Sequence, residues 1–409
     1  MLILVPPSNG YVKPVTKQTD LVVSNRRRPW TFETLEALQV HKDLLRAGIE
    51  PATRYTAASC PVSASTGQSM MIVAEAWKAS YLYWVFPALI VATVFAILGL
   101  IGVIFAIRLF AKYTCGRFRK TTRMDGKTVI VTGCTGGIGK ETARDLAKRG
   151  ARVIMACRNL EVAEKVKDEI IDSTKNTQVI VKKLDLSSFA SVREFAADIN
   201  KTEPKLDVLI HNAGYADTFK KRKTVDDIEM TMETNHYGPF LLTHLLIDLL
   251  KKSAPSRIVV VASSLYRLAS FNIDNPNPVD TIPGYLYYAS KEANILFTRE
   301  LARRLEGTGV TVNCLHPGLI ETGIWSSVPP PLNWMLFPII KFFFKTPKQG
   351  CQTTVMLAVD EQLEKVSGKY FSDCRESSLS SSVSNMSRAK KVWEVSERMV
   401  KLGDDDPRI

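Results

Sequence analysis

Residues 127–139 read KTVIVTGCTGGIG, and a helical pattern follows them directly. The β-branched run predicts a buried strand, and residues 140–147 alternate charged and apolar positions with the period of a helix. Glycines between a strand and a helix let the backbone approach a pyrophosphate, which the free N–H groups of the helix N-terminus stabilise. We therefore expect a dinucleotide to bind at Gly133, Gly137, Ile138 and Gly139. The spacing is GxxxGxG rather than GxGxxG, so a plain glycine turn is the alternative.

The same alternation of predicted strands and helices continues through residues 124–375. Six short β-branched runs alternate with helical stretches, namely KTVIVTG, ARVIMAC, TQVIVKKLD, LDVLIHN, RIVVVAS and GVTVNCLHP. Such alternation predicts right-handed βαβ crossovers and a parallel sheet with helices on both faces. The fold class expected is thus α/β, a doubly wound Rossmann sheet whose ligands bind beyond the carboxyl ends of the strands.

Residues at the ends of the second and third strands bear on the choice of cofactor. An acid after the second strand would bind the adenosine ribose of NAD, but here the strand ends Ala156-Cys157-Arg158. Because Arg158 can make a charge-assisted contact with a 2′-phosphate, NADP(H) is the expected cofactor, although a merely solvated arginine is the alternative. Asp185 either meets the adenine edge or caps the helix that starts near Ser188.

A long apolar segment precedes this domain. Residues 79–107 contain no charged side chain, Tyr81, Tyr83 and Trp84 stand near one end, and six basic residues with no acid lie between Arg108 and Arg123. This pattern predicts a single transmembrane helix over 78–110, a basic linker over 111–123 and a cytoplasmic catalytic domain. A buried core helix is the alternative. The membrane expected is that of the endoplasmic reticulum.

The two ends of the chain give weaker signals. Residues 1–77 form a leader that we expect to be poorly ordered, and Met70-Met71 would offer a start just ahead of the anchor. Residues 376–409 are expected to form a tail with an amphipathic helix over 389–402 that docks on the domain. Since six of the net thirteen positive charges flank the apolar segment, nucleic acid is not the expected partner. The seven cysteines are scattered and predict neither disulfides nor a metal site.

Over residues 124–375 the chain resembles the short-chain dehydrogenase/reductase family. The motifs that carry the resemblance are TGCTGGIG at 132–139, LDLSS at 184–188, HNAG at 211–214, ETNHYGPF at 233–240, VASS at 261–264, YYASK at 287–291 and HPGLIET at 316–322. ARVIMACRN, LFTRELARRLEGTGVTVNCLHPG and SGKYFSDC look like its membrane-anchored retinol dehydrogenase branch. The resemblance implies that the cofactor is lined by Asn212, Ala213, Gly214, Tyr287, Lys291, Pro317, Gly318 and Thr322.

The resemblance also implies a catalytic set of Ser264, Tyr287, Lys291 and Asn235. Helix geometry alone leaves Tyr287 and Tyr288 open, because both share a face with Lys291, and the family spacing YxxxK selects Tyr287. Lys291 would lower the pKa of the tyrosine and bind the nicotinamide ribose. Ser264 would orient the substrate oxygen, and Asn235 would hold a water of the proton relay.

The substrate is expected to be apolar. Residues 325–345, WSSVPPPLNWMLFPIIKFFFK, are rich in aromatic and aliphatic side chains but too short to span a bilayer. The segment either roofs a pocket, lies in the membrane interface or packs as an ordinary helix. Retinol and retinal are the favoured pair, with steroids or fatty aldehydes as alternatives, and a catalytically silent membrane-tethered binding protein is the rival hypothesis. The sequence does not decide the oligomeric state, for which a homodimer is one option.

Overall fold

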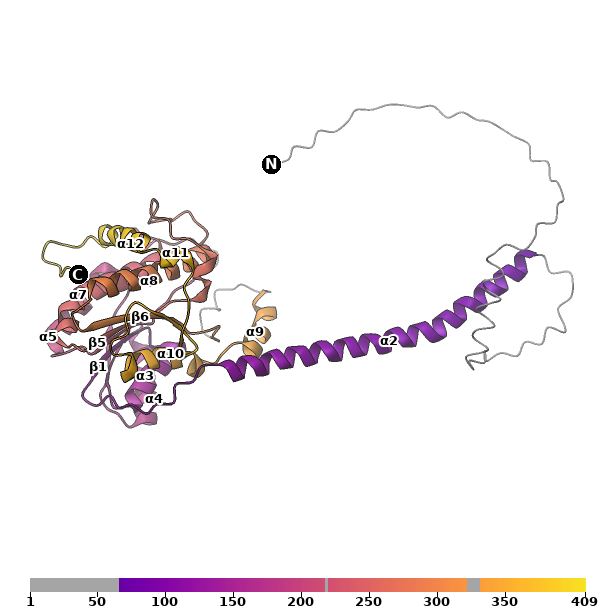
Figure 1. Ribbon diagram of the computed structural model, residues 1–409, viewed down its shortest axis with the longest axis horizontal. Coiled ribbons are helices and arrows are strands. Elements are labelled where there is room, and N and C mark those ends of the chain that lie inside the picture. The colour runs from indigo at the N-terminus through magenta and orange to yellow at the C-terminus, as the bar shows by residue number, and fades with distance from the viewer. Residues whose placement is uncertain (1–65, 218–219, 322–331) are drawn as a thin grey trace, which may run out of the picture. The chain divides into compact units, whose positions relative to one another are not determined.

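The computed structural model describes residues 66–217, 220–321 and 332–409 (Figure 1). Its centre is an eight-stranded sheet of order β3-β2-β1-β4-β5-β6-β7-β8. Neighbouring strands are parallel except for β8, which pairs antiparallel with β7. The strands are β1 (Thr128–Thr132), β2 (Arg152–Cys157), β3 (Val179–Lys183), β4 (Val208–His211), β5 (Ser256–Val261), β6 (Val310–His316), β7 (Tyr370–Ser372) and β8 (Arg375–Glu376). The predicted doubly wound sheet is confirmed.

Helices cover both faces of this sheet (Figure 1). One face carries α3 (Gly137–Lys148), α4 (Leu160–Thr174) and α10 (Pro347–Val359), and the other carries α5 (Phe189–Thr202), α7 (Gly238–Lys252), α8 (Pro283–Arg304) and α12 (Met386–Met399). Side chains of a strand point alternately to the two faces, so Ile130 joins the core under α5 and α7 while Val129 and Val131 join the core under α3. Both faces are buried, as a parallel sheet requires.

Short elements complete the connections. They are α6 (Met230–Met232), the π-helical turn η1 (Glu233–Tyr237), the 3₁₀ turns η2 (Ser264–Leu268) and η4 (Glu361–Leu363), and α11 (Ser381–Ser384). The turns η1 and η2 lie after β4 and β5, at the carboxyl edge of the sheet. This edge is where a doubly wound fold binds its ligands.

The helix α2 (Thr66–Thr114) contains the apolar segment and is longer than the predicted span of 78–110. It is the one helix among the described residues that is long and apolar enough to cross a membrane, over Met71–Thr114. The division between the two compact units of the chain falls inside it, between Thr93 and Val94. Residues 1–65 of the predicted leader lie outside the described residues.

The C-terminal helix packs into the core of the domain, in agreement with the expected docking of residues 389–402. Trp393 of α12 is fully buried and stacks on Phe297 of α8 with ring centres 5.9 Å apart. Arg193 and Asp406 form a bidentate ion pair, and Arg304 donates to the carbonyl of Ile409 at 2.9 Å. The packing partners of α12 are distant in sequence, so the amphipathic pattern indicated the docking but not the residues it contacts.

Residues 319–345 leave the sheet after β6 and return to the same place. The amide of Lys345 donates to the carbonyl of Leu319 at 2.8 Å, and the amide of Glu321 donates to the carbonyl of Lys345 at 3.0 Å. The described part of this excursion includes α9 (Leu332–Phe343). Thr346 then caps α10 in a capping box with Gln349.

Candidate active site

The glycine-rich loop joins β1 to α3, and two of its glycines, Gly133 and Gly139, leave no room for a side chain. Gly133 has a φ of +72°, and a Cβ there would lie 2.8 Å from the Cα of Ala213. A Cβ on Gly139 would lie 2.2 Å from the carbonyl oxygen of Gly133, so a side chain at either position would push the loop apart. Gly136 precedes α3 without a side-chain cap, and the first turn of the helix holds no acid. The free N–H groups of this turn can therefore receive a phosphate.

Asn212 connects the end of β4 to this loop. Its Nδ2 donates to the carbonyls of Thr132 at 2.9 Å and Gly133 at 3.1 Å. The amide of Ala213 donates to the hydroxyl of Thr132 at 3.0 Å. The structure thus brings Asn212 and Ala213 against the glycine loop, where their hydrogen bonds hold its shape.

The two residues predicted to select the cofactor lie at the ends of β2 and β3. Arg158 is exposed and has no ion pair with any acid among the described residues, which leaves its guanidinium available to an anion. Asp185 accepts from the amide of Ser187 at 3.0 Å and from its hydroxyl at 2.6 Å. The N-cap of α5 is Ser188, so Asp185 closes a turn and does not cap the helix itself.

Tyr287 and Lys291 lie one turn apart on α8, at the carboxyl end of β5. The Lys291 Nζ is 5.5 Å from the centre of the Tyr287 ring and donates to the carbonyl of Val261 at 3.0 Å. Burial lowers the pKa of Lys291 to about 8. Burial also raises the pKa of Tyr287 to about 12, which is opposite to the lowering expected from Lys291. At neutral pH the site therefore holds a neutral phenol beside an ammonium.

Asn235 comes from the π-helical turn η1 and faces the same lysine. Its Oδ1 accepts from the amide of Tyr215 at 2.7 Å, and its Nδ2 donates to the Tyr215 carbonyl at 2.8 Å and to the Ser290 hydroxyl at 3.0 Å. A Cβ on Gly214 would lie 3.7 Å from Lys291 Nζ and 3.9 Å from Asn235 Oδ1. Gly214, Asn235 and Lys291 therefore surround one small space.

Two adjacent serines, Ser263 and the predicted Ser264, lie where β5 ends. The Ser263 side chain hydrogen-bonds the Tyr287 phenol and thereby lowers its pKa against the effect of burial. Ser264 instead interacts with His316, through its amide to Nδ1 at 3.1 Å and its hydroxyl with Nε2 at 3.2 Å. The reason is local: Ser263 is extended, with a φ of −156°, and its side chain caps η2, whereas Ser264 is already the first residue of that turn. Ser263 is thus a second candidate beside Tyr287, and the predicted Ser264 stays a prediction.

The segment after β6 carries the remaining predicted residues. Gly318 has a φ of +98°, and the Lys345 side chain packs so closely that a Cβ there would lie 2.8 Å from Lys345 Cδ. Lys345 also pairs with Asp373. Pro317 immediately precedes Gly318, and Thr322 lies outside the described residues. Sequence reasoning named neither His316 nor Lys345 for the site, although His316 opens the HPG motif.

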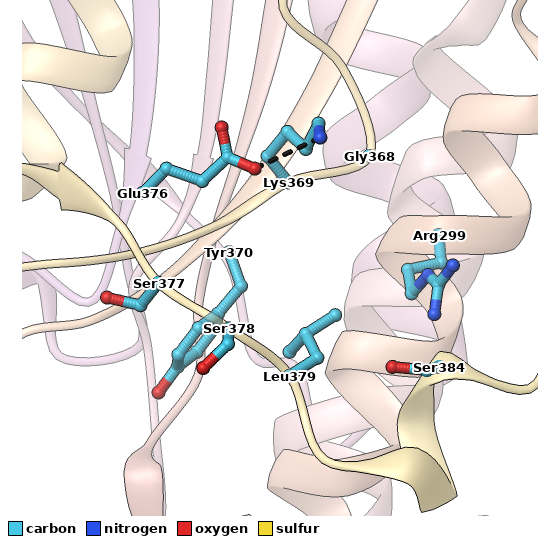
Figure 2. A pocket seen from close by; sticks show the side chains of 9 residues that line it. All are labelled: Arg299, Gly368, Lys369, Tyr370, Glu376, Ser377, Ser378, Leu379 and Ser384. Atoms are coloured by element: carbon cyan, nitrogen blue, oxygen red, sulfur yellow. Dashed lines mark ion pairs between the residues drawn. The ribbon is translucent and has the colours of Figure 1, made fainter.

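A separate shallow cavity of about 320 Å³ lies between the β7–β8 region and α8 (Figure 2). Its lining includes Arg299, Tyr370 and Ser378, and it contains an ion pair between Lys369 and Glu376 of 3.0 Å. It shares no residue with the predicted site, so it does not serve as the catalytic pocket.

Comparison with known proteins agrees with this geometry. The short chain dehydrogenase family matches residues 127–332. Retinol dehydrogenase 14 of Mus musculus is 47% identical over 291 residues, covering 68% of this chain and 86% of that protein. Retinol dehydrogenase 11 of Homo sapiens is 47% identical over 279 residues, with the same coverage of 68% and 86%.

Among solved structures, a short chain dehydrogenase from Escherichia coli CFT073 complexed with NADPH is 26% identical with a TM-score of 0.51. The match covers 63% of this chain and 100% of that one. Sequence relatives and structural neighbours thus agree on one fold and one family. The chain belongs to the short-chain dehydrogenase/reductase family, on its retinol dehydrogenase branch, and is an oxidoreductase.

Proposed function

We propose that this protein is an NADP(H)-dependent enzyme that interconverts retinol and retinal, with Tyr287 as the general acid and base. The observation that carries the proposal is the grouping of Tyr287, Lys291, Ser263 and Asn235 at the carboxyl ends of β4 and β5. Relatives that are 47% identical and named retinol dehydrogenases support the choice of substrate.

The residues present fit a dinucleotide phosphate. The loop at Gly133, Gly137, Ile138 and Gly139, in which Gly133 and Gly139 leave no room for a side chain, would hold the pyrophosphate. Arg158 would pair with a 2′-phosphate. NADPH, when bound, supplies the hydride. Other contacts would come from Asp185, Asn212, Ala213, Gly214, Pro317 and Gly318, near the carboxyl edge of the sheet. Thr322 is proposed from the family motif alone.

The chain's own residues would manage the proton. Tyr287 is protonated at neutral pH and can donate to the substrate oxygen as negative charge develops there. With a pKa of about 8, Lys291 is mainly an ammonium at pH 7, and its charge stabilises the phenolate that remains. The Ser263 hydroxyl would orient the substrate oxygen, and Asn235 would hold a water that returns the proton.

We further propose a single-pass protein of the endoplasmic reticulum membrane with its catalytic domain in the cytoplasm. The support is the uncharged segment 79–107 followed by the basic run up to Arg123. Two glycosylation sequons begin at the exposed residues Asn200 and Asn385 of the domain. A glycan on either, detected as a mass shift removed by a glycosidase, would contradict this orientation.

The catalytic proposal is tested with the matched variants Tyr287→Phe and Tyr288→Phe. We expect the first to lose nearly all retinal reduction while keeping NADPH binding, measured by cofactor fluorescence, and the second to stay largely active. A panel of retinal, a steroid ketone and a fatty aldehyde, each with NADPH and NADH, identifies the substrate class. If the wild-type enzyme reduces none of them, the protein is a silent binding protein and the proposal fails.

A further inference from the structure

The helix α9 exposes an unusual amount of apolar surface for a short helix. Five of its large side chains are between 37% and 73% exposed, namely Trp334, Met335, Phe337, Ile339 and Phe343. Ile340 is buried against the domain and Leu336, one turn earlier, is partly buried. The helix therefore rests on the protein along one narrow stripe. Contiguous exposed apolar side chains of this kind mark a surface that another phase or molecule covers.

The contact between α9 and the end of α2 shows what lies beside this surface. The Arg108 guanidinium stacks over the Phe342 ring at 4.1 Å, and both residues belong to the compact unit 94–409. Arg108 is the first charged residue after the uncharged segment 79–107. If that segment crosses a bilayer, Arg108 stands at the level of the lipid headgroups. A helix in contact with Arg108 lies at the same level.

Charge on α9 and on the segment that follows the apolar run matches a membrane surface. Lys341 of α9 and the basic residues Lys112, Arg117 and Arg119 that follow the apolar segment are all exposed. Each of these four forms no ion pair with an acid among the described residues. Basic side chains beside exposed aromatic ones are the pattern of a helix that lies in the interface of an anionic membrane.

We propose that α9 is a second membrane contact, which lies along the headgroup boundary of the bilayer that α2 crosses. Its outward apolar side chains enter the acyl region, and Lys341 and the basic segment bind anionic lipid headgroups. A roof over a pocket would turn these side chains toward the domain, whereas they point away from it. At about 18 Å in length the helix cannot span the bilayer and must lie on it.

The placement of α9 also gives a route for the substrate, and this step rests on the function proposed above. The excursion that carries α9 closes at Leu319 and Lys345, directly beside Gly318. Gly318 is among the residues proposed to bind the cofactor. A lipid-dissolved carbonyl would therefore pass from the bilayer at α9 to the edge of the sheet beside Gly318, and from there to Tyr287.

The depth of α9 can be measured in the full-length protein, reconstituted in nanodiscs of phosphatidylcholine and phosphatidylserine. A nitroxide is attached at Trp334→Cys, and at Val225→Cys as the control, since Val225 is 84% exposed on the same domain. Both variants carry Cys60→Ser, because five of the other six cysteines are buried and Cys374 is partly buried. We expect the label at 334 to be relaxed by oxygen and protected from a water-soluble nickel chelate, and the label at 225 to show the reverse. A label at 334 that is as accessible to nickel as the control, or is protected from both agents, overturns the proposal.

The route is tested by activity in the same nanodiscs. The double variant Trp334→Glu with Phe337→Glu should raise the apparent KM for retinal by about tenfold or more, because charged side chains leave the acyl region. The KM for NADPH should not change, and Val225→Glu should match the wild type. An unchanged KM for retinal refutes the route. If no carbonyl is reduced at all, the proposed function fails, while the nitroxide depth still decides where α9 lies.

Discussion

The adjacent serines offer a sharp test of the site, because alanine at each removes one hydroxyl with a different partner. The Ser263 hydroxyl interacts with the Tyr287 phenol, and the Ser264 hydroxyl lies 3.2 Å from Nε2 of His316. If Ser263 orients the substrate oxygen, Ser263→Ala should lower kcat about 10²–10³-fold, as the loss of one donor to a developing oxyanion does. Ser264→Ala should leave kcat within a few-fold of the wild type.

Stability does not separate the two variants, which makes them matched controls. Ser263→Ala removes the cap that accepts from the amide of Leu265 at 3.2 Å, a loss of about 1 kcal/mol. Ser264→Ala removes one side-chain hydrogen bond, also about 1 kcal/mol, and keeps the bond from its amide to His316. We expect similar shifts in denaturant midpoint for both variants and a large difference in steady-state retinal reduction. A collapse of turnover in Ser264→Ala with activity kept in Ser263→Ala would refute the reasoning.

Three other predictions concern the cofactor, the proton and the core. Arg158→Ala should raise the KM for NADPH roughly 10- to 100-fold, since a hydrogen bond to a charged group contributes about 1.5–3 kcal/mol, and should leave the KM for NADH nearly unchanged. The pKa of Lys291 is lowered to about 8, and its ammonium is the proposed active form. We therefore expect kcat/KM for retinal reduction to fall as the pH rises through about 8. A profile that stays flat to pH 10 would contradict this. Trp393→Ala should destabilise the domain by about 3–5 kcal/mol in urea unfolding, whereas Trp334→Ala, at an exposed position, should change stability little in detergent.

The sheet and its phosphate loop were predictable because their signals are local. Val129, Ile130 and Val131 form a continuous apolar run, as a strand buried on both faces must, and the glycines follow where the backbone has to turn. Helical spacing likewise predicts a face shared by Lys291 with both Tyr287 and Tyr288, and the choice of Tyr287 comes from the family resemblance. Such features need no knowledge of distant partners.

Features set by distant contacts were not predictable in this way. Which of Ser263 and Ser264 faces Tyr287 depends on the backbone direction where β5 ends and η2 begins. Two consecutive serines in a sequence do not indicate that direction. The amphipathic period indicated the C-terminal helix, but its burial depends on Phe297, far away in sequence. Residues 332–343 are apolar on nearly all sides, so no polar face could indicate their orientation, which follows from the packing of Ile340 and the contact with Arg108.

The closed base of the 319–345 excursion bears on how such enzymes diversify. Because Leu319 and Lys345 meet through backbone hydrogen bonds, the segment between them can change in length or composition while β6 and α10 keep their positions. Each doubling of the length of a flexible loop adds only about 0.6 kcal/mol of closure entropy. If α9 contacts the membrane as proposed, a change in residues 319–345 would alter where the enzyme meets its substrate and would leave Tyr287 and Lys291 in place.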